Sequence, residues 1–230
     1  MITACTESDG LTPLDSMSRL FKTWIARGLF VVLGPLGLAG GAQAQEAPDA
    51  LVKRVVEEVT SAIRIDKELQ SGNRVKINAL IDGKVAPVIN FQRMTQSAVG
   101  RHWQRATPEQ QRDLTREFRV LLTNTYSYAF SEYKSETVIE YRPMRMQAGD
   151  TDAVVRSLIR TGSREPIQLD YYLEKSDAGW KVVDLNVLGA RLVENYKNTF
   201  NSEINNNGVD GLIKSLAAKN KSLEAKNRAS

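Results

Sequence analysis

The first half of the chain alternates between apolar positions at helical spacing and short polar breaks. The spacing predicts a helix over 48–69 and a second helix over 74–86, which Pro87 bends or ends. One or two short helices are predicted over 91–105, interrupted at Gly100. The folded part of the chain therefore begins with helices rather than with strands.

The strongest helix start in the chain lies at Thr107. Its hydroxyl can cap the helix, Pro108 suits the first helical position, and Gln110 completes a capping box. The predicted helix runs to about Tyr133. Its broad apolar face contains Leu114, Phe118, Leu121, Leu122, Thr125, Ala129 and Tyr133, and is widened by Tyr126, Tyr128 and Phe130.

The pattern then changes to a period of two, which predicts strands over 136–142, 153–160, 167–175 and 180–187. In the third strand one face carries apolar residues and the other carries polar ones. The apolar residues are Ile167, Leu169, Tyr171 and Leu173, and the polar ones are Gln168, Asp170 and Glu174. One dry face and one wet face are typical of an antiparallel sheet that is covered on one side.

Two helices are predicted after the strands, over 190–205 and 209–219, separated by an Asn-Gly stop signal. The polar tail over 219–230 is expected to fray. The predicted fold class is α+β, with a curved antiparallel sheet of about four strands packed against long helices. A strongly curved sheet that faces helices leaves a conical space between them, and either side chains or a ligand must fill this space.

The first 44 residues have the layout of a signal region. A basic stretch is followed by the uncharged run 28–41 and by the small-x-small sequence Ala42-Gln43-Ala44. The alternative, a membrane anchor, is disfavoured because this run is too short to span a bilayer. Cleavage after about Ala44 leaves 186 of the 230 residues, with a single domain expected over 45–218.

Residues 1–16 fit poorly in front of a signal peptide, because they contain three acidic residues and no Lys or Arg. We interpret Met17 as the true start, residues 17–44 as the signal peptide and residues 1–16 as a mis-assigned start. N-terminal sequencing of the unprocessed precursor tests this interpretation, and recovery of residues 1–16 contradicts it.

Cysteine content and charge narrow the function classes further. The only cysteine, Cys5, precedes the expected cleavage site, so the exported chain needs no disulfide. The net charge of +4 is the same with or without the first 44 residues. It is too weak and too interspersed to indicate a nucleic-acid partner, but it suits approach to anionic head groups or to an acidic partner.

Catalytic and metal-binding motifs are missing from the sequence, so no cofactor and no metal are expected. The single histidine, His102, stands beside Trp103 without the spacing of a metal site, and no nucleotide-binding or nucleophile motif occurs. Asp170 and Asp184 are the best acid candidates. We interpret Asp170 as solvent-facing, and Asp184 as a buried residue that makes structural hydrogen bonds between apolar neighbours.

Two stretches of the chain resemble one known family. They are INFQRMTQSAVGRHWQRATPEQQRDLTREFRVLLTNTYSYAFSEY (89–133) and GWKVVDLNVLGARLVENYKNTFNSEINNNGVDGLIKSL (179–216). They are similar to the periplasmic phospholipid-binding component of the Mla system (maintenance of outer-membrane lipid asymmetry), also called the toluene-tolerance or ABC-transporter auxiliary family. The family's motifs Phe-x-x-Met, Gly-x-x-Trp, Ala-Thr-x-x-Gln and Phe-x-x-Leu-Leu-x-x-Thr-Tyr occur in order, and the resemblance covers nearly all of 48–216.

Two positions depart from the family pattern. The sequence after the last strand is Leu188-Gly189-Ala190-Arg191 where the family usually has Glu-Gly-Val-Ser, and Gln92 stands where an Asp is common. The polar contacts of the family at these two points therefore do not carry over to this chain.

The resemblance implies a nuclear-transport-factor-2-like cone that holds the acyl chains of a glycerophospholipid between sheet and helices. It also implies a shuttle between an outer-membrane lipoprotein complex and an inner-membrane ABC transporter with a ring-forming lipid-binding subunit. The residues expected to line the lipid site are Phe118, Leu122, Tyr126, Leu169, Tyr171, Leu173, Val183, Leu185 and Val187. The same residues serve as ordinary core if side chains fill the space.

The free energy of burying acyl chains determines how completely such a carrier must enclose its lipid. Each buried methylene contributes about 0.8 kcal/mol, and two ordinary acyl chains hold roughly 30 such groups. A carrier that competes with a bilayer must therefore match on the order of 20 kcal/mol of burial, which requires nearly complete enclosure of both chains.

Two other function classes remain open from the sequence. The first is an isomerase- or dehydratase-like enzyme on the same cone, with Asp170, Asp184 or Tyr171 as acid or base, which predicts an inward-facing polar pair. The second is an adaptor whose helices bind another envelope protein, which predicts a core filled by side chains. The volume of the interior space separates the adaptor from the carrier.

Overall fold

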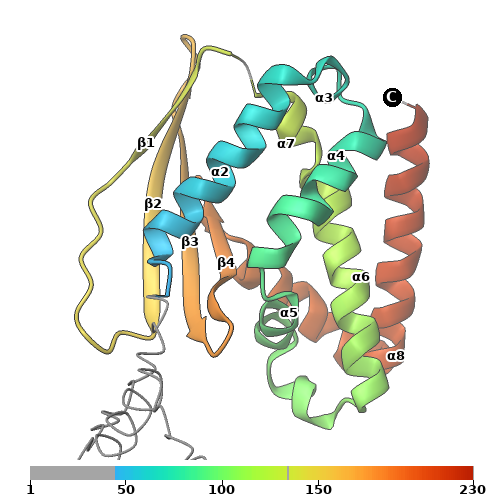
Figure 1. The fold of residues 1–230 in the computed structure, drawn as a ribbon. Helices are drawn as coiled ribbons and strands as arrows, with labels where there is room; N and C mark the ends of the chain where they lie inside the picture. The colour runs from blue at the N-terminus through green and yellow to red at the C-terminus, as the bar shows by residue number, and fades with distance from the viewer. Residues whose placement is uncertain (1–44, 134, 230) are drawn as a thin grey trace, which may run out of the picture. The chain divides into compact units, whose positions relative to one another are not determined.

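A computed structural model describes residues 45–133 and 135–229 of the chain (Figure 1). The predicted signal region over 1–44 lies outside the described residues. In the described part, helices come first, strands follow, and a long bent helix ends the chain, which is the order that the sequence predicts.

The strands form one antiparallel sheet in the order β1-β2-β3-β4-β5. The four predicted strands are confirmed, each with ends that differ from the prediction by one residue at most. A fifth strand was not predicted, because it is only two residues long and has no alternation to detect. The bounds are β1 Thr137–Tyr141, β2 Asp152–Thr161, β3 Ile167–Ser176, β4 Gly179–Val187 and β5 Ala190–Arg191.

The N-terminal helix α2 (Pro48–Ile65) packs its apolar stripe against the sheet (Figure 1). The single helix predicted over 48–69 is broken at Asp66, whose side chain accepts hydrogen bonds from the backbone of the next turn and starts α3 (Lys67–Gln70). Helix α4 (Arg74–Leu80) continues as a π turn over Ile81–Val85 and a 3₁₀ turn over Ala86–Val88. The irregular turns coincide with Pro87, where the sequence predicts the helix to bend or end.

The middle helices begin close to the predicted positions, but the helix predicted to run to about Tyr133 breaks before that residue. Helix α5 (Phe91–Val99) passes into a 3₁₀ turn over Gly100–Arg105, and Gly100 has φ of +62°, which a side chain would disfavour. The capping box at Thr107 is present at the start of α6 (Pro108–Tyr126). A break at Ser127 then separates α6 from the short helix α7 (Tyr128–Ser131).

The last helix, α8 (Leu192–Ala229), consists of two arms joined at Gly208, which has φ of +73°. This kink lies at the predicted Asn-Gly stop signal. The expectation that the tail frays from Lys219 is wrong for the described residues, because the helix continues to Ala229. Asn220 is buried and donates to the backbone oxygen and the carboxylate of Glu117 at 3.0 and 2.9 Å, which fastens the second arm to α6.

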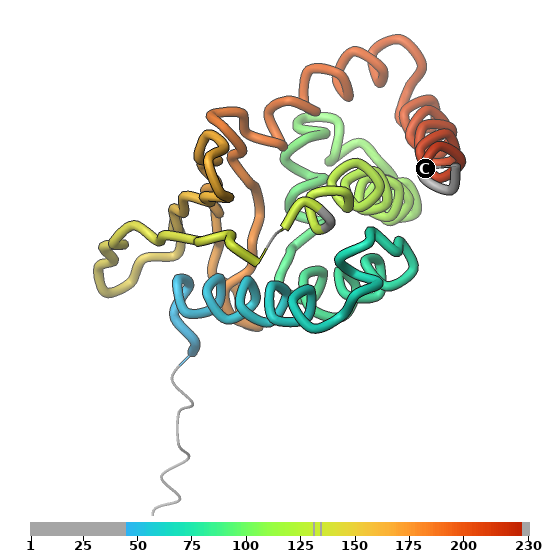
Figure 2. Tube along the Cα trace, turned by 90° about the horizontal axis from the view of Figure 1, so that it is seen from above, coloured from blue at the N-terminus to red at the C-terminus, as the bar shows by residue number. Residues whose placement is uncertain are grey.

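Two apolar clusters make up the core. The sheet-side cluster joins α2, α3, α4 and the turn that follows to strands β2, β3 and β4. The helix-side cluster joins α5, α6 and α8. Seen from above, α8 begins beside the sheet, its second arm lies on the far side of α6 from the sheet, and α2 runs from the sheet toward α4 (Figure 2). Among the described residues, Ile89 and Leu185 pack against both clusters.

Candidate functional site

A β-bulge in β4 sets which residues face the helices. Leu173 pairs with Val182 and Tyr172 with Asp184, so Val183 is an extra residue between the two pairs. Beyond the bulge Leu185 is opposite Tyr171, on the same face of the sheet as Leu173. The bulge therefore keeps the apolar residues of both halves of β4 on the inner face.

The inner face holds two kinds of apolar residue. Leu173 and Val155 are closed off, each with 1 % of its surface exposed. Tyr171, Leu185 and Tyr141 are half-buried although they also pack against the sheet-side cluster. Half-buried apolar side chains on an inward face leave apolar surface that a ligand can cover.

Half-buried apolar side chains also lie on the helices. On the sheet side they are Val56 of α2, Phe130 of α7 and Tyr133, and on the helix side they are Tyr126 of α6 and Tyr196 of α8. Together with the inner face of the sheet, they form what we call the apolar wall: Val56, Tyr126, Phe130, Tyr133, Tyr141, Leu169, Tyr171, Leu185, Val187 and Tyr196.

Tyr171 lies deepest in the apolar wall. Burial raises the pKa of its phenol well above the ordinary value, although its hydrogen bond with Ser157 opposes this rise. The same side chain still has exposed surface. The phenol of Tyr171 is therefore strongly desolvated although part of the side chain stays exposed.

The tyrosines of the helix side have a similar environment. Burial raises the pKa of Tyr126 to about 12 and also raises that of Tyr196, which hydrogen-bonds with Tyr126 and Thr125. The Tyr196 ring meets Phe118 edge-to-face with centroids 5.0 Å apart, and Phe118 meets Phe200 at 5.1 Å. The aromatic packing holds Tyr196 against α6.

The nine residues predicted to line a lipid site fall into two groups in the structure. Phe118, Leu122 and Leu173 are buried in the two clusters and have 8 % of their surface exposed or less. The other six are half-buried: Tyr126, Leu169, Tyr171, Val183, Leu185 and Val187. Contact of these nine residues with a lipid stays a prediction. The six half-buried residues are the better candidates, because they have exposed surface that a lipid can touch.

Five residues of the apolar wall were not predicted as lining: Val56, Phe130, Tyr133, Tyr141 and Tyr196. Phe130 and Tyr133 were noticed as part of the apolar helix face, and the alternation of the first strand contained Tyr141. The break at Ser127, which turns α7 toward the sheet-side cluster, has no clear signal in the sequence.

The two candidate acids lie on the outer face of the sheet, away from Tyr171. Asp184 is buried, with 2 % exposed, and accepts hydrogen bonds from the backbone of Leu185 and Val193 and from Nε of Arg191, at 2.8, 3.0 and 2.8 Å. The Arg191 guanidinium also stacks on Tyr172 at 4.1 Å. The structure thus gives Asp184 the structural hydrogen bonds that the sequence predicts, at the start of α8.

The prediction that Asp170 faces solvent is wrong. It is on the outer face as predicted, but it is buried, with 4 % exposed, rather than solvent-facing. Gln168 donates to one carboxylate oxygen at 2.9 Å, and Asn186 is its cross-strand neighbour. Register alone places a side chain on a face, whereas the long neighbours on that face decide whether water reaches it.

His102 is buried, and no three His, Cys, Asp or Glu residues among those described come together as a metal site. None of the helices in residues 45–133 and 135–229 combines the length and the apolar character that crossing a membrane requires.

The fold and the apolar wall define an α+β protein whose sheet and helices face each other across half-exposed apolar side chains. Comparison with known proteins gives the family. The model of the MlaC protein family matches residues 53–218, and the chain belongs to this family.

Relatives and a solved structure agree with this assignment. The toluene tolerance protein ttg2D of Pseudomonas putida is 24% identical over 188 residues, which cover 81% of this chain and 85% of that protein. The intermembrane phospholipid transport system binding protein MlaC of Haemophilus influenzae is 21% identical over 197 residues, covering 84% and 90%. A phospholipid-binding protein of Ralstonia solanacearum, solved in complex with a phospholipid, is 42% identical with a TM-score of 0.72, covering 76% of this chain and 98% of that one.

Proposed function

We propose that the protein is a periplasmic phospholipid carrier that encloses acyl chains against the apolar wall and moves lipid between membrane complexes. The observation that carries the proposal is the combination of inward-facing, half-exposed apolar residues with likeness to a protein solved with a phospholipid bound. The structural likeness extends over 98% of that protein and 76% of this chain, so it concerns most of the fold rather than one motif.

The location of the exposed apolar surface supports a carrier. Leu185 packs against both clusters but keeps exposed surface, so it stands where the sheet side and the helix side face each other. A ligand that inserts between the two sides covers apolar surface on both. Each buried methylene contributes about 0.8 kcal/mol, so a carrier that competes with a bilayer must cover nearly all of them. Contact with both sides covers more methylenes than contact with one side.

An enzyme on the same scaffold is less well supported. The enzyme hypothesis requires an inward-facing polar pair drawn from Asp170, Asp184 and Tyr171. The register places both aspartates on the outer face and Tyr171 on the inner face, so no such pair forms. The relatives, moreover, are named for binding, transport and tolerance rather than for a reaction.

The proposed partners are those that the resemblance to the family implies. A carrier of this kind receives lipid from one complex and delivers it to another, and we propose an outer-membrane lipoprotein complex and an inner-membrane ABC transporter with a lipid-binding ring subunit. The Haemophilus influenzae relative, named as the binding protein of an intermembrane phospholipid transport system, supports this assignment.

Mass spectrometry of extracted lipids tests the proposed function. The chain Gln45–Ser230 is expressed with export and purified without detergent. We expect stoichiometric phospholipid, and the molar ratio of acyl chains to protein gives the number of chains enclosed. A folded protein that is free of lipid, and that also takes up no phospholipid from vesicles, contradicts the carrier and favours the adaptor.

A further inference from the structure

The net positive charge of the chain is concentrated in the second arm of α8. Residues 45–212 contain 23 Lys and Arg residues and 23 Asp and Glu residues, so their side chains carry no net charge. Residues 213–230 contain five Lys and Arg residues and a single Glu, so they account for the whole net charge of +4. The charge therefore belongs to one element rather than to the surface in general.

The lysines of this arm lie on its outer surface. Leu212 and Leu216 are buried in the helix-side cluster, and the buried Asn220 donates to Glu117 of α6, so this side of the arm packs against α6. The side chains of four lysines of the arm are exposed, and two of them, seven residues apart, repeat after about two helical turns on the side that points away from α6. We call these four residues the lysine face: Lys214, Lys219, Lys221 and Lys226.

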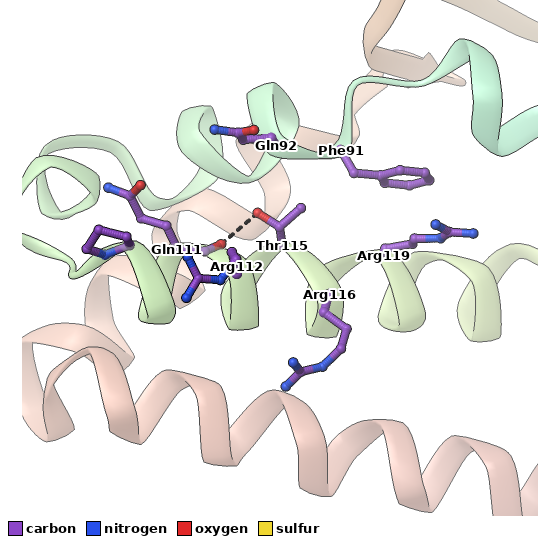
Figure 3. A pocket seen from close by; sticks show the side chains of 8 residues that line it. Phe91, Gln92, Gln111, Arg112, Thr115, Arg116 and Arg119 are labelled. Atoms are coloured by element: carbon purple, nitrogen blue, oxygen red, sulfur yellow. Dashed lines mark hydrogen bonds between the residues drawn. The ribbon is translucent and has the colours of Figure 1, made fainter.

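Carboxylates do not neutralise the lysine face. Lys214, Lys219 and Lys221 have no carboxylate within ion-pair distance among the described residues. Helix α6, on which the arm packs, has no net charge, because it contains three carboxylates and the three arginines that line a pocket toward α5 in Figure 3: Arg112, Arg116 and Arg119. Of these carboxylates, Asp113 and Glu117 already pair with Arg116, at 2.6 and 3.2 Å.

We propose that the lysine face binds the surface of an anionic phospholipid bilayer. A lysine ammonium is a compact, strongly hydrated charge on a flexible stem, and it is attracted to anionic head groups without needing a fixed geometry. Several such charges on one exposed helix side add up close to a negatively charged surface.

The other exposed residues of the arm favour a bilayer over a protein partner. Over residues 213–226 they are serines, alanines and one glutamate. The large aromatic residues and arginines that supply most of the binding energy in protein interfaces are missing from this exposed side. The inference goes beyond the proposed carrier function and does not rest on it, because the lysine face and the apolar wall share no residue.

Flotation of the chain Gln45–Ser230 with lipid vesicles tests the proposal. We expect the protein to float with vesicles of phosphatidylcholine that contain about one third phosphatidylglycerol, to stay behind with pure phosphatidylcholine vesicles, and to be released as salt is added. A carrier that only extracts a lipid molecule into its own site leaves the vesicle and does not float, so this readout is separate from lipid uptake. No flotation with the anionic vesicles overturns the proposal.

A matched pair of double variants locates the effect. Lys214→Gln combined with Lys221→Gln keeps good helix formers in the arm and should weaken partitioning onto the anionic vesicles by about tenfold. Lys67→Gln combined with Lys175→Gln removes the same net charge from exposed positions of α3 and β3, and should leave partitioning within about twofold.

The remaining outcomes contradict the proposal. Equal weakening by the two double variants indicates general charge attraction rather than a lysine face. Equal flotation with both kinds of vesicle indicates an apolar contact. Binding of a labelled hexaglutamate peptide that the α8 double variant weakens, without flotation, assigns the lysine face to an acidic protein partner instead.

Discussion

Arg64 near the end of α2 donates two hydrogen bonds to the Tyr133 hydroxyl, from Nη2 at 2.9 Å and from Nε at 3.2 Å, although the two residues are 69 positions apart. Its guanidinium also lies 5.9 Å from the centre of the Tyr133 ring. Tyr133 follows α7 and belongs to the apolar wall. The contact therefore joins α2 to the segment that carries Phe130 and Tyr133.

Other arginines fasten the same segment. Arg74 of α4 donates to the Ser127 hydroxyl at 3.3 Å, and Arg164 from the turn between β2 and β3 donates to Glu132 at 3.0 Å. A short helix held by polar contacts at its surface opens at lower cost than a helix held by packing. We therefore expect α7 to be the part of the apolar wall that moves when lipid enters or leaves.

Substitution of Arg64 tests this expectation. Arg64→Ala removes both hydrogen bonds to Tyr133 and should speed the transfer of labelled phospholipid to acceptor vesicles about fivefold, because the segment around Tyr133 then opens more readily. Tyr133→Phe keeps the ring and should act in the same direction. Arg54→Ala, on the same helix but paired with Glu46 and Glu58, is the control and should leave the rate unchanged. Equal rates for all three variants and the wild type contradict a role for the contact.

The division of the predicted lining residues into buried and half-buried groups gives a second prediction. Leu169→Trp fills the space beside Val187 and should reduce co-purified phospholipid to less than about half, because added volume excludes the ligand. Val138→Trp, at an exposed position of β1, is the matched control and should keep the lipid. Full lipid content in Leu169→Trp places the ligand elsewhere.

Phe118→Ala should behave in the opposite way. Phe118 is fully buried between Tyr196 and Phe200, so its truncation should lower the free energy of unfolding by about 3–5 kcal/mol. Denaturant unfolding measures this loss of stability. The folded fraction should still carry phospholipid, which mass spectrometry of the extracted lipids measures. Selective loss of lipid without loss of stability contradicts its assignment to the core.

Asp184→Asn separates a structural role from a catalytic one. The amide has one acceptor oxygen in place of two, so it cannot satisfy Arg191 and both backbone groups as the carboxylate does. We expect the free energy of unfolding to fall by about 2 kcal/mol, with lipid content and lipid transfer unchanged. Asp177→Asn, in the exposed turn between β3 and β4, should have no effect on either. Loss of transfer at full stability would revive the enzyme hypothesis.

The buried tyrosines predict how stability depends on pH. Burial raises the pKa of Tyr126 and of Tyr141 to about 12, above the ordinary value of 10.0. Between these values the unfolded chain has lost the phenol proton while the folded chain keeps it, so the free energy of unfolding should fall as pH rises from about 10 to about 12. Tyrosinate absorbance and denaturant unfolding over this range measure the effect. Tyr141→Phe should make the fall shallower, and an unchanged slope contradicts the assignment.

The sequence predicted the elements well because periodicity reports which side of an element is apolar. It could not locate the bulge at Val183, since the residues on both sides of it are apolar and read as a continuous strand. It also missed the burial of Asp170, which depends on neighbours from other strands. The sequence also could not assign Tyr133 to the sheet-side cluster and Tyr196 to the helix-side cluster, because only the tertiary structure determines these contacts.

The division of the core into two clusters has a consequence for the working cycle of a carrier. Each cluster is packed by its own fully buried residues, such as Val155 on the sheet side and Phe200 on the helix side, and the shared residues Ile89 and Leu185 remain half-buried. Neither half depends on cargo for its packing. The lipid-free protein should therefore stay folded between two rounds of transport. A folded lipid-free state resists the proteases that an unfolded chain would meet.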